Sequence, residues 1–251
     1  MTEIVLNGCN GKMGMAVSRL IAERDDCKIV AGVDINNSVP RDFPVFSNIK
    51  EVEKGDVIID FSHPSCLSDL LEYAVTNKTP VVVATTGLSD ADIDNIKSAS
   101  KCVAVFFTFN MSLGINLLVE LSKTASRILG DKFDVEIIEK HHNQKLDAPS
   151  GTAIMIANAI DDAKENKMQF EFDRQSKRQK RTKNEIGIHS VRGGTIVGDH
   201  DVIFAGTDEV ITFSHTAYSK AVFGKGAIQA AKFLKGKGPG HYQMSQVIDE
   251  A

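Results

Sequence analysis

Glycines recur at every third position in the segment Gly8-Cys9-Asn10-Gly11-Lys12-Met13-Gly14, near the start of the chain. Glycine lets a backbone approach a pyrophosphate closely, and a helix that begins there supplies amide groups and a favourable dipole. Cys9 stands where the commoner G-x-G-x-x-G motif has its first glycine, so the spacing alone indicates a dinucleotide only weakly. The alternative is a tight turn without a ligand.

The surroundings of this segment favour the dinucleotide. A strand-like run precedes it and a helical pattern follows it. Asp34 ends the next strand about 20 residues after the loop, where an acid that binds ribose hydroxyls is expected. A carboxylate repels a 2′-phosphate, whereas Lys12 within the loop can attract one. The sequence therefore predicts NADH or NADPH, with a lean toward NADH.

A second group of reactive residue types follows a strand end. His141, His142 and Lys145 lie close together, and Ser150-Gly151-Thr152 opens a helix. Amides at Gly151 and Thr152 can hold a carboxylate, the nearby cations add charge, and histidine moves protons near neutral pH. Adjacent histidines on a strand point to opposite faces, so no metal site is expected. The pattern alone leaves a site for a small acidic substrate and a solvated loop equally open.

Strands and helices must alternate to position these residues in the first half of the chain. Apolar runs predict strands over residues 3–7, 28–33, 56–61, 80–84 and 103–107, with helices over 13–23, from about Ser65 to Asn77, and 89–98. Strands that alternate with helices of this length are typical of βαβ units. Continuous Val and Ile runs indicate a parallel sheet that is covered on both faces. We therefore expect a Rossmann-type α/β domain.

The pattern changes after Asn110. Helices are expected over residues 112–129, from Ser150, and over 217–234, with strands over 133–139, 185–191, 195–205 and 209–214. The hairpin-like strands predict a smaller α+β domain with a mixed or antiparallel sheet. We place the dinucleotide-binding domain at residues 1–111 plus 217–251 and the substrate-binding and oligomerisation domain at 112–216, with a hinge near Asn110 and Ala217.

Composition narrows the classes of partner. The 251 residues carry a net charge of -4 and are 42% hydrophobic, which argues against general attraction to nucleic acid or to anionic lipid. No run approaches the roughly 20 apolar residues of a membrane span, and no signal peptide is evident. The four cysteines are scattered without metal-ligand spacing. We expect a cytoplasmic enzyme with reduced thiols, without membrane or nucleic-acid partners.

Six ordered motifs give the chain a resemblance that spans nearly its whole length. The segment Glu139-x-His141-His142-x-x-Lys145-x-Asp147-Ala148-Pro149-Ser150-Gly151-Thr152-Ala153 resembles the signature of the 4-hydroxy-tetrahydrodipicolinate reductase (dihydrodipicolinate reductase) family. The glycine loop is similar as well. The other four are Asp60-Phe61-Ser62-His63-Pro64, Thr85-Thr86-Gly87, Asn110-Met111-Ser112-Leu113-Gly114 and the stretch from Arg192 to His200.

The resemblance implies NAD(P)H-dependent reduction of 4-hydroxy-tetrahydrodipicolinate, a dicarboxylate, in diaminopimelate and lysine biosynthesis. It implies that His141 donates a proton and that Lys145 assists, with the substrate carboxylates held by His142, Gly151 and Thr152. It implies cofactor contacts from Gly8, Cys9, Asn10, Gly11, Lys12, Met13, Asp34, Ala84, Thr85, Thr86, Thr108, Phe109, Asn110 and Met111. It also implies a homotetramer built through the second-domain sheets.

Some positions depart from the family pattern. Asp34 replaces a common glutamate, and Ile35 stands where some members have an arginine for the 2′-phosphate. Ala84 and Met111 replace a glycine and a phenylalanine found in some members. These departures leave the choice between NADH and NADPH open.

Two other functions fit part of the sequence. A different two-domain Rossmann dehydrogenase, of the aspartate or homoserine dehydrogenase type, shares the glycine loop but lacks the His-Lys signature. A regulator that senses NAD could bind nucleic acid through the six cations between Arg174 and Lys183. That stretch has no aromatic residue and no helix-turn-helix neighbour, so a solvated loop is the favoured interpretation.

Overall fold

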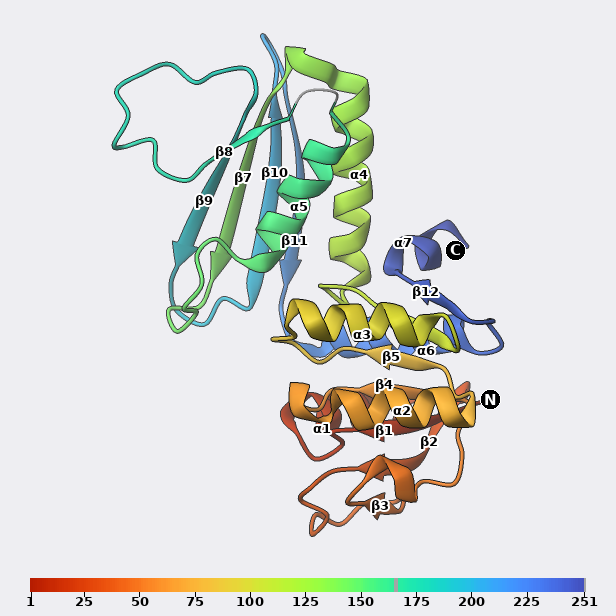
Figure 1. Ribbon diagram of the computed structural model, residues 1–251. Coiled ribbons are helices and arrows are strands. Elements are labelled where there is room, and N and C mark those ends of the chain that lie inside the picture. The colour runs from red at the N-terminus through yellow and green to blue at the C-terminus, as the bar shows by residue number, and fades with distance from the viewer. Residues whose placement is uncertain (165–166, 251) are drawn as a thin grey trace. The chain divides into compact units, whose positions relative to one another are not determined.

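Short runs rich in Val and Ile form the first sheet of the computed structural model (Figure 1). The structure describes residues 1–164 and 167–250, and within them this sheet has seven strands, all parallel to their neighbours. Their order is β12 (Gly240–Tyr242), β6 (Ala104–Phe107), β5 (Val81–Val83), β4 (Val57–Asp60), β1 (Thr2–Asn7), β2 (Cys27–Val33) and β3 (Val45–Phe46). The strand order reverses between β1 and β4, and open parallel sheets bind ligands at such a switch point.

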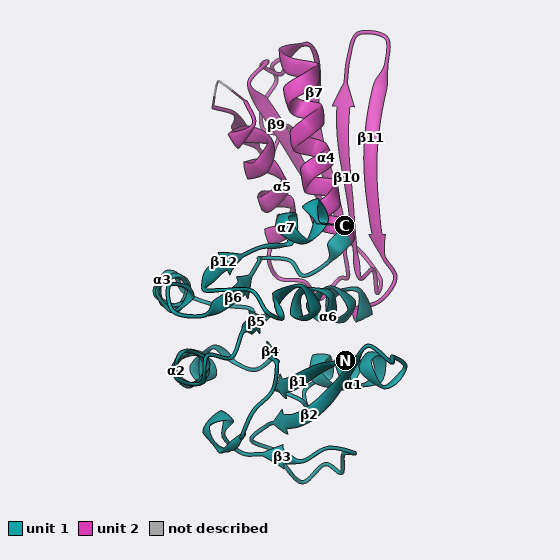
Figure 2. Cartoon of the chain, turned by 90° about the vertical axis from the view of Figure 1, so that its right-hand side faces the viewer, with its two compact units in different colours: residues 1–113, 221–251 teal, residues 114–220 magenta. Residues whose placement is uncertain are grey.

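Helices cover both faces of this sheet (Figure 2). On one face lie α1 (Lys12–Ala22), α6 (Ala221–Leu234) and α7 (Met244–Asp249), and on the other α2 (Leu67–Asn77) and α3 (Asp90–Ser100). Alternate residues of each strand supply the two cores, because side chains of a strand point to opposite faces. Ile4 and Leu6 of β1 belong to one core, whereas Val5 belongs to the other.

A second sheet forms in the middle of the chain. The described residues give it five strands in the order β11 (Val210–Ala217), β10 (Gly198–Ala205), β7 (Asp134–His141), β9 (Glu185–Arg192) and β8 (Gln169–Glu171). The pairs β11–β10 and β10–β7 are antiparallel, whereas β7–β9 and β9–β8 are parallel. The sheet is therefore mixed.

Two helices pack on one face of the mixed sheet. They are α4 (Leu113–Leu129) and α5 (Gly151–Asp162), and their apolar residues join the core cluster of Ile137, Val202 and Phe204. Along β7 buried and half-buried residues alternate, so that Val135, Ile137, Glu139 and His141 all point to the helix-covered face. This register brings two polar residues, Glu139 and His141, into the interior.

The chain divides into two compact units, which Figure 2 draws in different colours. The first unit comprises residues 1–113 and 221–251, and the second comprises residues 114–220. The second unit is thus an insertion between β6 and α6 of the parallel-sheet unit. The prediction of a Rossmann-type parallel sheet with a second domain around a mixed sheet is confirmed.

Several predicted element boundaries differ from the structure, and two elements begin three or four residues later than expected. The helix expected from Ala217 begins at Ala221, because Ala217 is still paired with Gly198 as the last residue of β11. The strand expected from Thr195 begins at Gly198, after a turn in which Gly194 has a positive φ of 49°. The sequence did not predict the edge strands β3, β8 and β12, of two or three residues, or the six-residue α7, because they are too short for a periodic signal and lack the Val run that marks the equally short β5.

The remaining short elements are single turns of 3₁₀-helix at Ile49–Glu51, Pro64–Cys66 and Gly130–Lys132. Within the described ranges, no helix combines the length and the apolar character that a membrane span requires.

Candidate active site

The glycine loop connects β1 to α1 at the switch point of the parallel sheet. Its first amides are bonded within the protein: Gly8 and Cys9 donate to the Val33 carbonyl at 2.8 and 3.2 Å, and Gly11 donates to the Gly8 carbonyl at 3.1 Å. Gly11 caps α1 without a side-chain hydrogen bond. The amides of Lys12 and Met13, in the first turn of α1, are therefore the ones that an anion would meet.

The glycines fit close approach by a pyrophosphate. A Cβ atom at Gly14 would lie 2.1 Å from the Gly8 carbonyl oxygen, and one at Gly8 would lie 2.5 Å from that of Phe61, so both positions require glycine for the turn itself. A Cβ atom at Gly11 would meet only the Gly8 oxygen, at 3.3 Å, and otherwise open space. The loop therefore leaves room for a ligand over the N-terminus of α1.

Asp34 and Arg41 flank this loop. The Asp34 carboxylate accepts hydrogen bonds of 2.9 Å from the amides of Asn10 and Asn36. Arg41 donates from Nε to Asn10 Oδ1 at 2.8 Å and from Nη2 to the Cys9 carbonyl at 3.0 Å. A carboxylate has lone pairs left for a ribose hydroxyl after two such bonds. Arg41 adds a positive charge at this loop, which the sequence did not predict.

The loop after β5 is held by a buried carboxylate. Thr85 donates from its hydroxyl to Asp60 at 2.7 Å, and Asn7 donates from its side-chain amide to Asp60 at 2.8 Å. Ala84 donates from its backbone to the Asp60 carbonyl at 2.9 Å, whereas Thr86 is exposed. Asp60 therefore joins the carboxyl ends of β1, β4 and β5.

The predicted cofactor residues after β6 differ in exposure. Phe109 is 74% exposed, whereas Met111 is 5% exposed with its side chain in the core. Thr108 and Asn110 hold the turn, with Thr108 Oγ1 donating to the Asn110 carbonyl and Asn110 Oδ1 accepting from the Ser112 amide. Cys9 is buried too, and burial raises the pKa of its thiol to about 11. The side chains of Cys9 and Met111 are therefore not exposed for contact with a cofactor.

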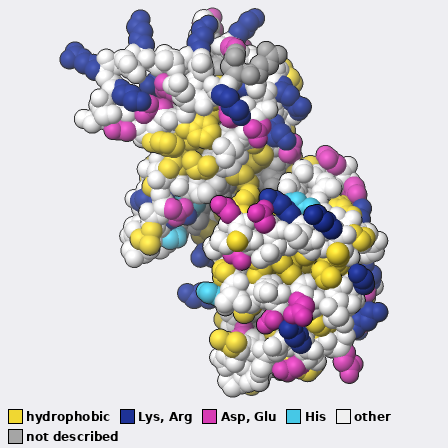
Figure 3. Space-filling model, viewed as in Figure 1, with side chains coloured by type: hydrophobic (Ala, Val, Ile, Leu, Met, Phe, Trp, Pro, Cys, Tyr) yellow, Lys and Arg dark blue, Asp and Glu magenta, His cyan; other side chains and the backbone are white. Residues whose placement is uncertain are grey.

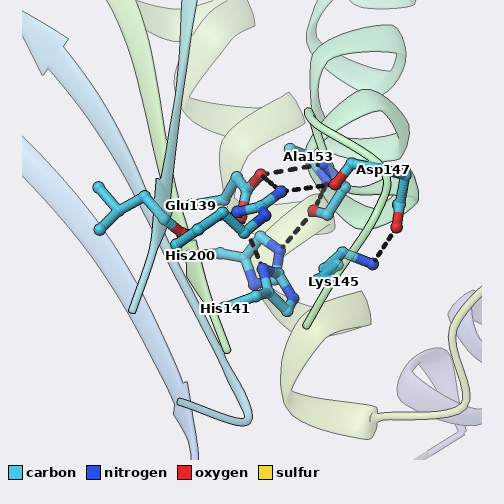
Figure 4. A network of polar contacts seen from close by, with 9 residues as sticks. Glu139, His141, Lys145, Asp147, Ala153 and His200 are labelled. Atoms are coloured by element: carbon cyan, nitrogen blue, oxygen red, sulfur yellow. Dashed lines mark hydrogen bonds and ion pairs between the residues drawn. The ribbon is translucent and has the colours of Figure 1, made fainter. Parts of the chain in front are cut away.

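In the second unit, a fully buried carboxylate organises the predicted substrate site (Figure 4). Glu139 accepts two hydrogen bonds from Arg192, at 2.6 and 2.8 Å. It also contacts His141 Nδ1 at 2.6 Å and accepts from the Ser150 amide at 3.1 Å. Burial by itself would raise the pKa of the Glu139 carboxyl. Hydrogen bonds from Arg192, Ser190, His141 and Ser150 outweigh this effect and lower the pKa to about 2. Glu139 is therefore ionised at neutral pH.

The other predicted substrate residues lie on the loop that follows β7 and on the first turn of α5. Lys145 forms a 2.8 Å ion pair with Asp147, and its amide donates to the His142 carbonyl at 3.1 Å. Ser150 caps α5 by accepting from the Ala153 amide at 3.2 Å. Gly151 is exposed at the start of α5, whereas His142 and Thr152 are half-buried. The structure thus brings His141 and Lys145 beside a helix N-terminus, where a carboxylate is favoured, whereas His142 follows His141 in the chain and is half-buried.

A neutral histidine completes this network. His200 Nε2 lies 3.2 Å from the Ser150 hydroxyl, and its ring packs edge-on against His141 with 5.3 Å between the ring centres. Burial, followed by the charge of His141, lowers the pKa of His200 to about 4. Across the described chain, no three His, Cys, Asp or Glu side chains gather as a metal-binding group.

The sequence assigned no role to five residues that have clear positions at these sites. Glu139, Arg192 and His200 belong to motifs that carry the resemblance, and Asp60 opens another, so the motifs contained a signal for them. Arg41 follows no spacing rule, because it comes from the irregular segment between β2 and β3.

The basic stretch between β8 and β9 is partly neutralised within its own unit. Arg174 pairs with Glu185 at 2.9 Å, Lys177 with Glu171, and Arg181 with Asp134. Figure 3 shows Lys and Arg side chains projecting from this end of the second unit with acidic side chains among them. This arrangement supports the interpretation of the stretch as a solvated loop.

Comparison with known proteins gives matches over almost the entire chain. The family model described as "Dihydrodipicolinate reductase, N-terminus" matches residues 2–111, and "Dihydrodipicolinate reductase, C-terminus" matches residues 114–248. A 4-hydroxy-tetrahydrodipicolinate reductase of Caldanaerobacter subterraneus subsp. tengcongensis is 53% identical over 249 residues, covering 99% of this chain and 98% of the relative. One of Clostridium tetani is 48% identical over 250 residues, covering 99% and 98%.

Solved structures agree with this relationship. The dipicolinate-bound dihydrodipicolinate reductase from Paenisporosarcina sp. TG-14 superposes with a TM-score of 0.81 at 25% identity, covering 97% of each chain. A probable dehydrogenase from Thermotoga maritima reaches a TM-score of 0.62 at 13% identity, covering 98% of this chain and 92% of its own, which shows a common fold alone.

The ion pair between Glu139 and Arg192 yields a test of the site's construction. We expect Arg192→Leu to lower the free energy of unfolding by about 3 kcal/mol at pH 7, because it leaves a buried carboxylate short of two donors. The pKa of Glu139 is lowered in the folded protein from 4.5 to about 2, so the stabilisation is complete above pH 4.5 and is lost toward pH 2. The difference in free energy of unfolding between wild type and variant, measured by urea unfolding, should become smaller as the pH falls over that range.

Lys97→Leu serves as the control, because Lys97 and Asp94 form an ion pair in which both side chains are more than half exposed. If the difference in free energy of unfolding between wild type and Arg192→Leu stayed constant between pH 7 and pH 3, the assignment of an ionised Glu139 would be contradicted.

Proposed function

The chain belongs to the dihydrodipicolinate reductase family, and we propose that it reduces 4-hydroxy-tetrahydrodipicolinate to tetrahydrodipicolinate with NADH or NADPH. The reaction consumes one reduced nucleotide and one proton and releases water, as a step of diaminopimelate and lysine biosynthesis. The observation that carries the proposal is the His141–Glu139–Arg192 network beside Lys145 and the start of α5, in a chain 53% identical to a named reductase.

The residues of the first unit fit the nucleotide. The amides of Lys12 and Met13 would hold the pyrophosphate, and Asp34 would accept from a ribose hydroxyl. The loops 84–86 and 108–111 follow β5 and β6, where the carboxyl edge of the sheet would meet the nicotinamide end. When bound, the reduced nicotinamide supplies a hydride.

The residues of the second unit fit a small dicarboxylate. His142, Lys145 and the amides at Gly151 and Thr152 would orient its carboxylates, and such positioning contributes a large part of catalysis. His141 would give a proton to the ring carbon beside the one that is reduced, with Lys145 assisting. The substrate hydroxyl leaves as water, so that a hydrogen replaces the hydroxyl group on the ring carbon that is reduced.

The cofactor proposal is that both nucleotides are accepted because Asp34 and Arg41 lie together at the loop. Asp34 favours the free hydroxyl of NADH, and Arg41 has guanidinium donors beyond its two bonds to the loop with which to contact the 2′-phosphate of NADPH. This arginine would replace the one that Ile35 does not provide.

We place the enzyme in the cytoplasm as a homotetramer. Cys9, Cys27, Cys66 and Cys102 are free thiols, which fits a reducing compartment. The face of the mixed sheet opposite α4 and α5 presents half-buried residues such as Ile138 and Ile203, and no described helix of this unit covers it. Burial of that face against other copies would remove its apolar side chains from water.

We expect His141→Gln to lower turnover by about 10²–10⁴-fold because glutamine cannot transfer the proton. Steady-state assays with freshly made substrate would measure turnover, and fluorescence titration should show an unchanged dissociation constant for NADH. His189→Gln is the matched control, since His189 contacts Glu136 on the same unit. Normal turnover by His141→Gln would refute the proton-donor role.

Substitutions at Asp34 and Arg41 should affect the two nucleotides in opposite ways. We expect Asp34→Ala to weaken the binding of NADH more than that of NADPH. We expect Arg41→Ala to weaken the binding of NADPH at least tenfold more than that of NADH, as for loss of a charge-assisted hydrogen bond. Dissociation constants by calorimetry give both ratios. Arg19→Ala, at an exposed position of α1, is the control. Equal losses for both nucleotides would show that neither residue discriminates between them.

Light scattering should give a mass of four times the 27.3 kDa chain. We expect Ile203→Glu to yield smaller species, because it places a charge on the open face of the mixed sheet. Ile128→Glu is the control, since Ile128 is 77% exposed on α4. A monomeric wild type, or a tetrameric Ile203→Glu, would contradict the proposed interface.

A further inference from the structure

A charged side chain lies behind the proposed proton donor. Glu139 has no exposed surface, yet His141 Nδ1 contacts its Oε2 at 2.6 Å and two Arg192 nitrogens donate to its two oxygens. Burying a carboxylate is costly unless several donors compensate for the lost water. Here Arg192 and the Ser150 amide supply three donors, so the arrangement holds a full negative charge against one nitrogen of the imidazole.

The ionised carboxylate determines which nitrogen of His141 carries a hydrogen. An ionised carboxylate only accepts hydrogen bonds, so the contact of 2.6 Å requires a hydrogen on Nδ1. In a neutral imidazole one nitrogen is the donor and the other the acceptor. Nε2 is therefore the nitrogen left without a hydrogen, and so the one free to accept a proton.

The surroundings of Nε2 also restrict the ring. A Cβ atom at Gly198 would lie 3.0 Å from His141 Nε2, so glycine at the start of β10 leaves the space that this edge of the imidazole needs. His200 packs edge-on against the ring from the same strand. Glu139 on one side and β10 on the other thus restrict rotation of the imidazole.

We propose that Glu139 is a positioning residue, which fixes His141 in the tautomer with hydrogen on Nδ1 and so makes Nε2 the proton-transferring atom. Arg192 acts one step further back, because it keeps Glu139 ionised and oriented. The inference rests on the proposed role of His141, but the tautomer itself does not depend on that role and can be measured separately. Holding a histidine by a buried carboxylate in this way favours one tautomer and stabilises the imidazolium.

The test is the nitrogen NMR spectrum of ¹⁵N-histidine-labelled protein without substrate, at a pH where His141 is neutral. His141→Gln identifies the signals. In wild type Nδ1 should show the shift of a protonated nitrogen and Nε2 that of an unprotonated one. In Glu139→Gln the amide oxygen turns to Arg192 and the amide NH₂ faces Nδ1, so the two shifts should exchange. Turnover should fall by about 10²–10⁴-fold with little change in KM for the substrate.

Two further variants separate positioning from general damage. Glu139→Asp retains a carboxylate and should keep the wild-type tautomer with a smaller loss of turnover. Glu136, on the same strand as Glu139, contacts His189 Nε2 of β9 at 2.8 Å, so Glu136→Gln removes a matching carboxylate and should leave the His141 signals and turnover unchanged.

A wild-type spectrum with hydrogen on Nε2 would overturn the proposal, even if Glu139→Gln did not fold. So would a folded Glu139→Gln variant that kept the wild-type tautomer or retained turnover within about twofold. If the tautomer exchanges as expected while His141→Gln stays active, the role of His141 fails and the geometry at Glu139 stands.

Discussion

A buried carboxylate needs several hydrogen-bond donors to replace water. Each unit of this protein is arranged around one such carboxylate. In the second unit Glu139 accepts from Arg192 and from the Ser150 amide, and it contacts His141. These bonds connect β7, β9 and the beginning of α5, so the strand end, the following loop and the helix cap are fixed as one body. Removal of any single donor would leave a buried charge undercompensated.

The first unit repeats this principle at its sheet edge. Asp60 is buried, which raises its pKa, while hydrogen bonds from Ser62, Thr85 and Asn7 favour the ionised form. The acceptor joins the ends of three parallel strands, and the loops that leave those strands are the ones expected to meet the nucleotide. Internal bonding of the amides of residues 8–11 has a similar effect, since it holds the glycine loop in shape and directs only the first turn of α1 outward.

We expect the two units to divide the chemistry between them, because each has a structure suited to one part of it. A parallel sheet with a helix beginning at its switch point suits a long anionic nucleotide, because helix dipoles and amides meet its phosphates. A mixed sheet covered on one face by α4 and α5 provides a buried strand that can hold acid–base groups. Insertion of the second unit between β6 and α6 leaves the parallel sheet intact, since α6 and β12 still complete it.

Local patterns in the sequence determined the elements and the residue types at both sites. Apolar runs predicted the long strands, glycine spacing predicted the turn into α1, and the segment from Glu139 to Ala153 identified the family. The sequence did not predict β3 and β8, because two or three residues at a sheet edge carry neither a readable period nor a long apolar run. It also extended a helical pattern back to Ala217, where pairing with β10 keeps the chain in a strand.

Only the tertiary structure decided which side chains act on one another. Period-two alternation places Glu139 and His141 on the buried face of β7, but it does not reveal that β9 brings Arg192 opposite His141, 53 residues from Glu139. The same holds for Asp60 with Asn7, and for Arg41 beside the glycine loop. Cys9 and Met111 were predicted as cofactor contacts, whereas packing buries both side chains. Periodicity fixes the face on which a residue lies, and strand register and core packing fix its partner.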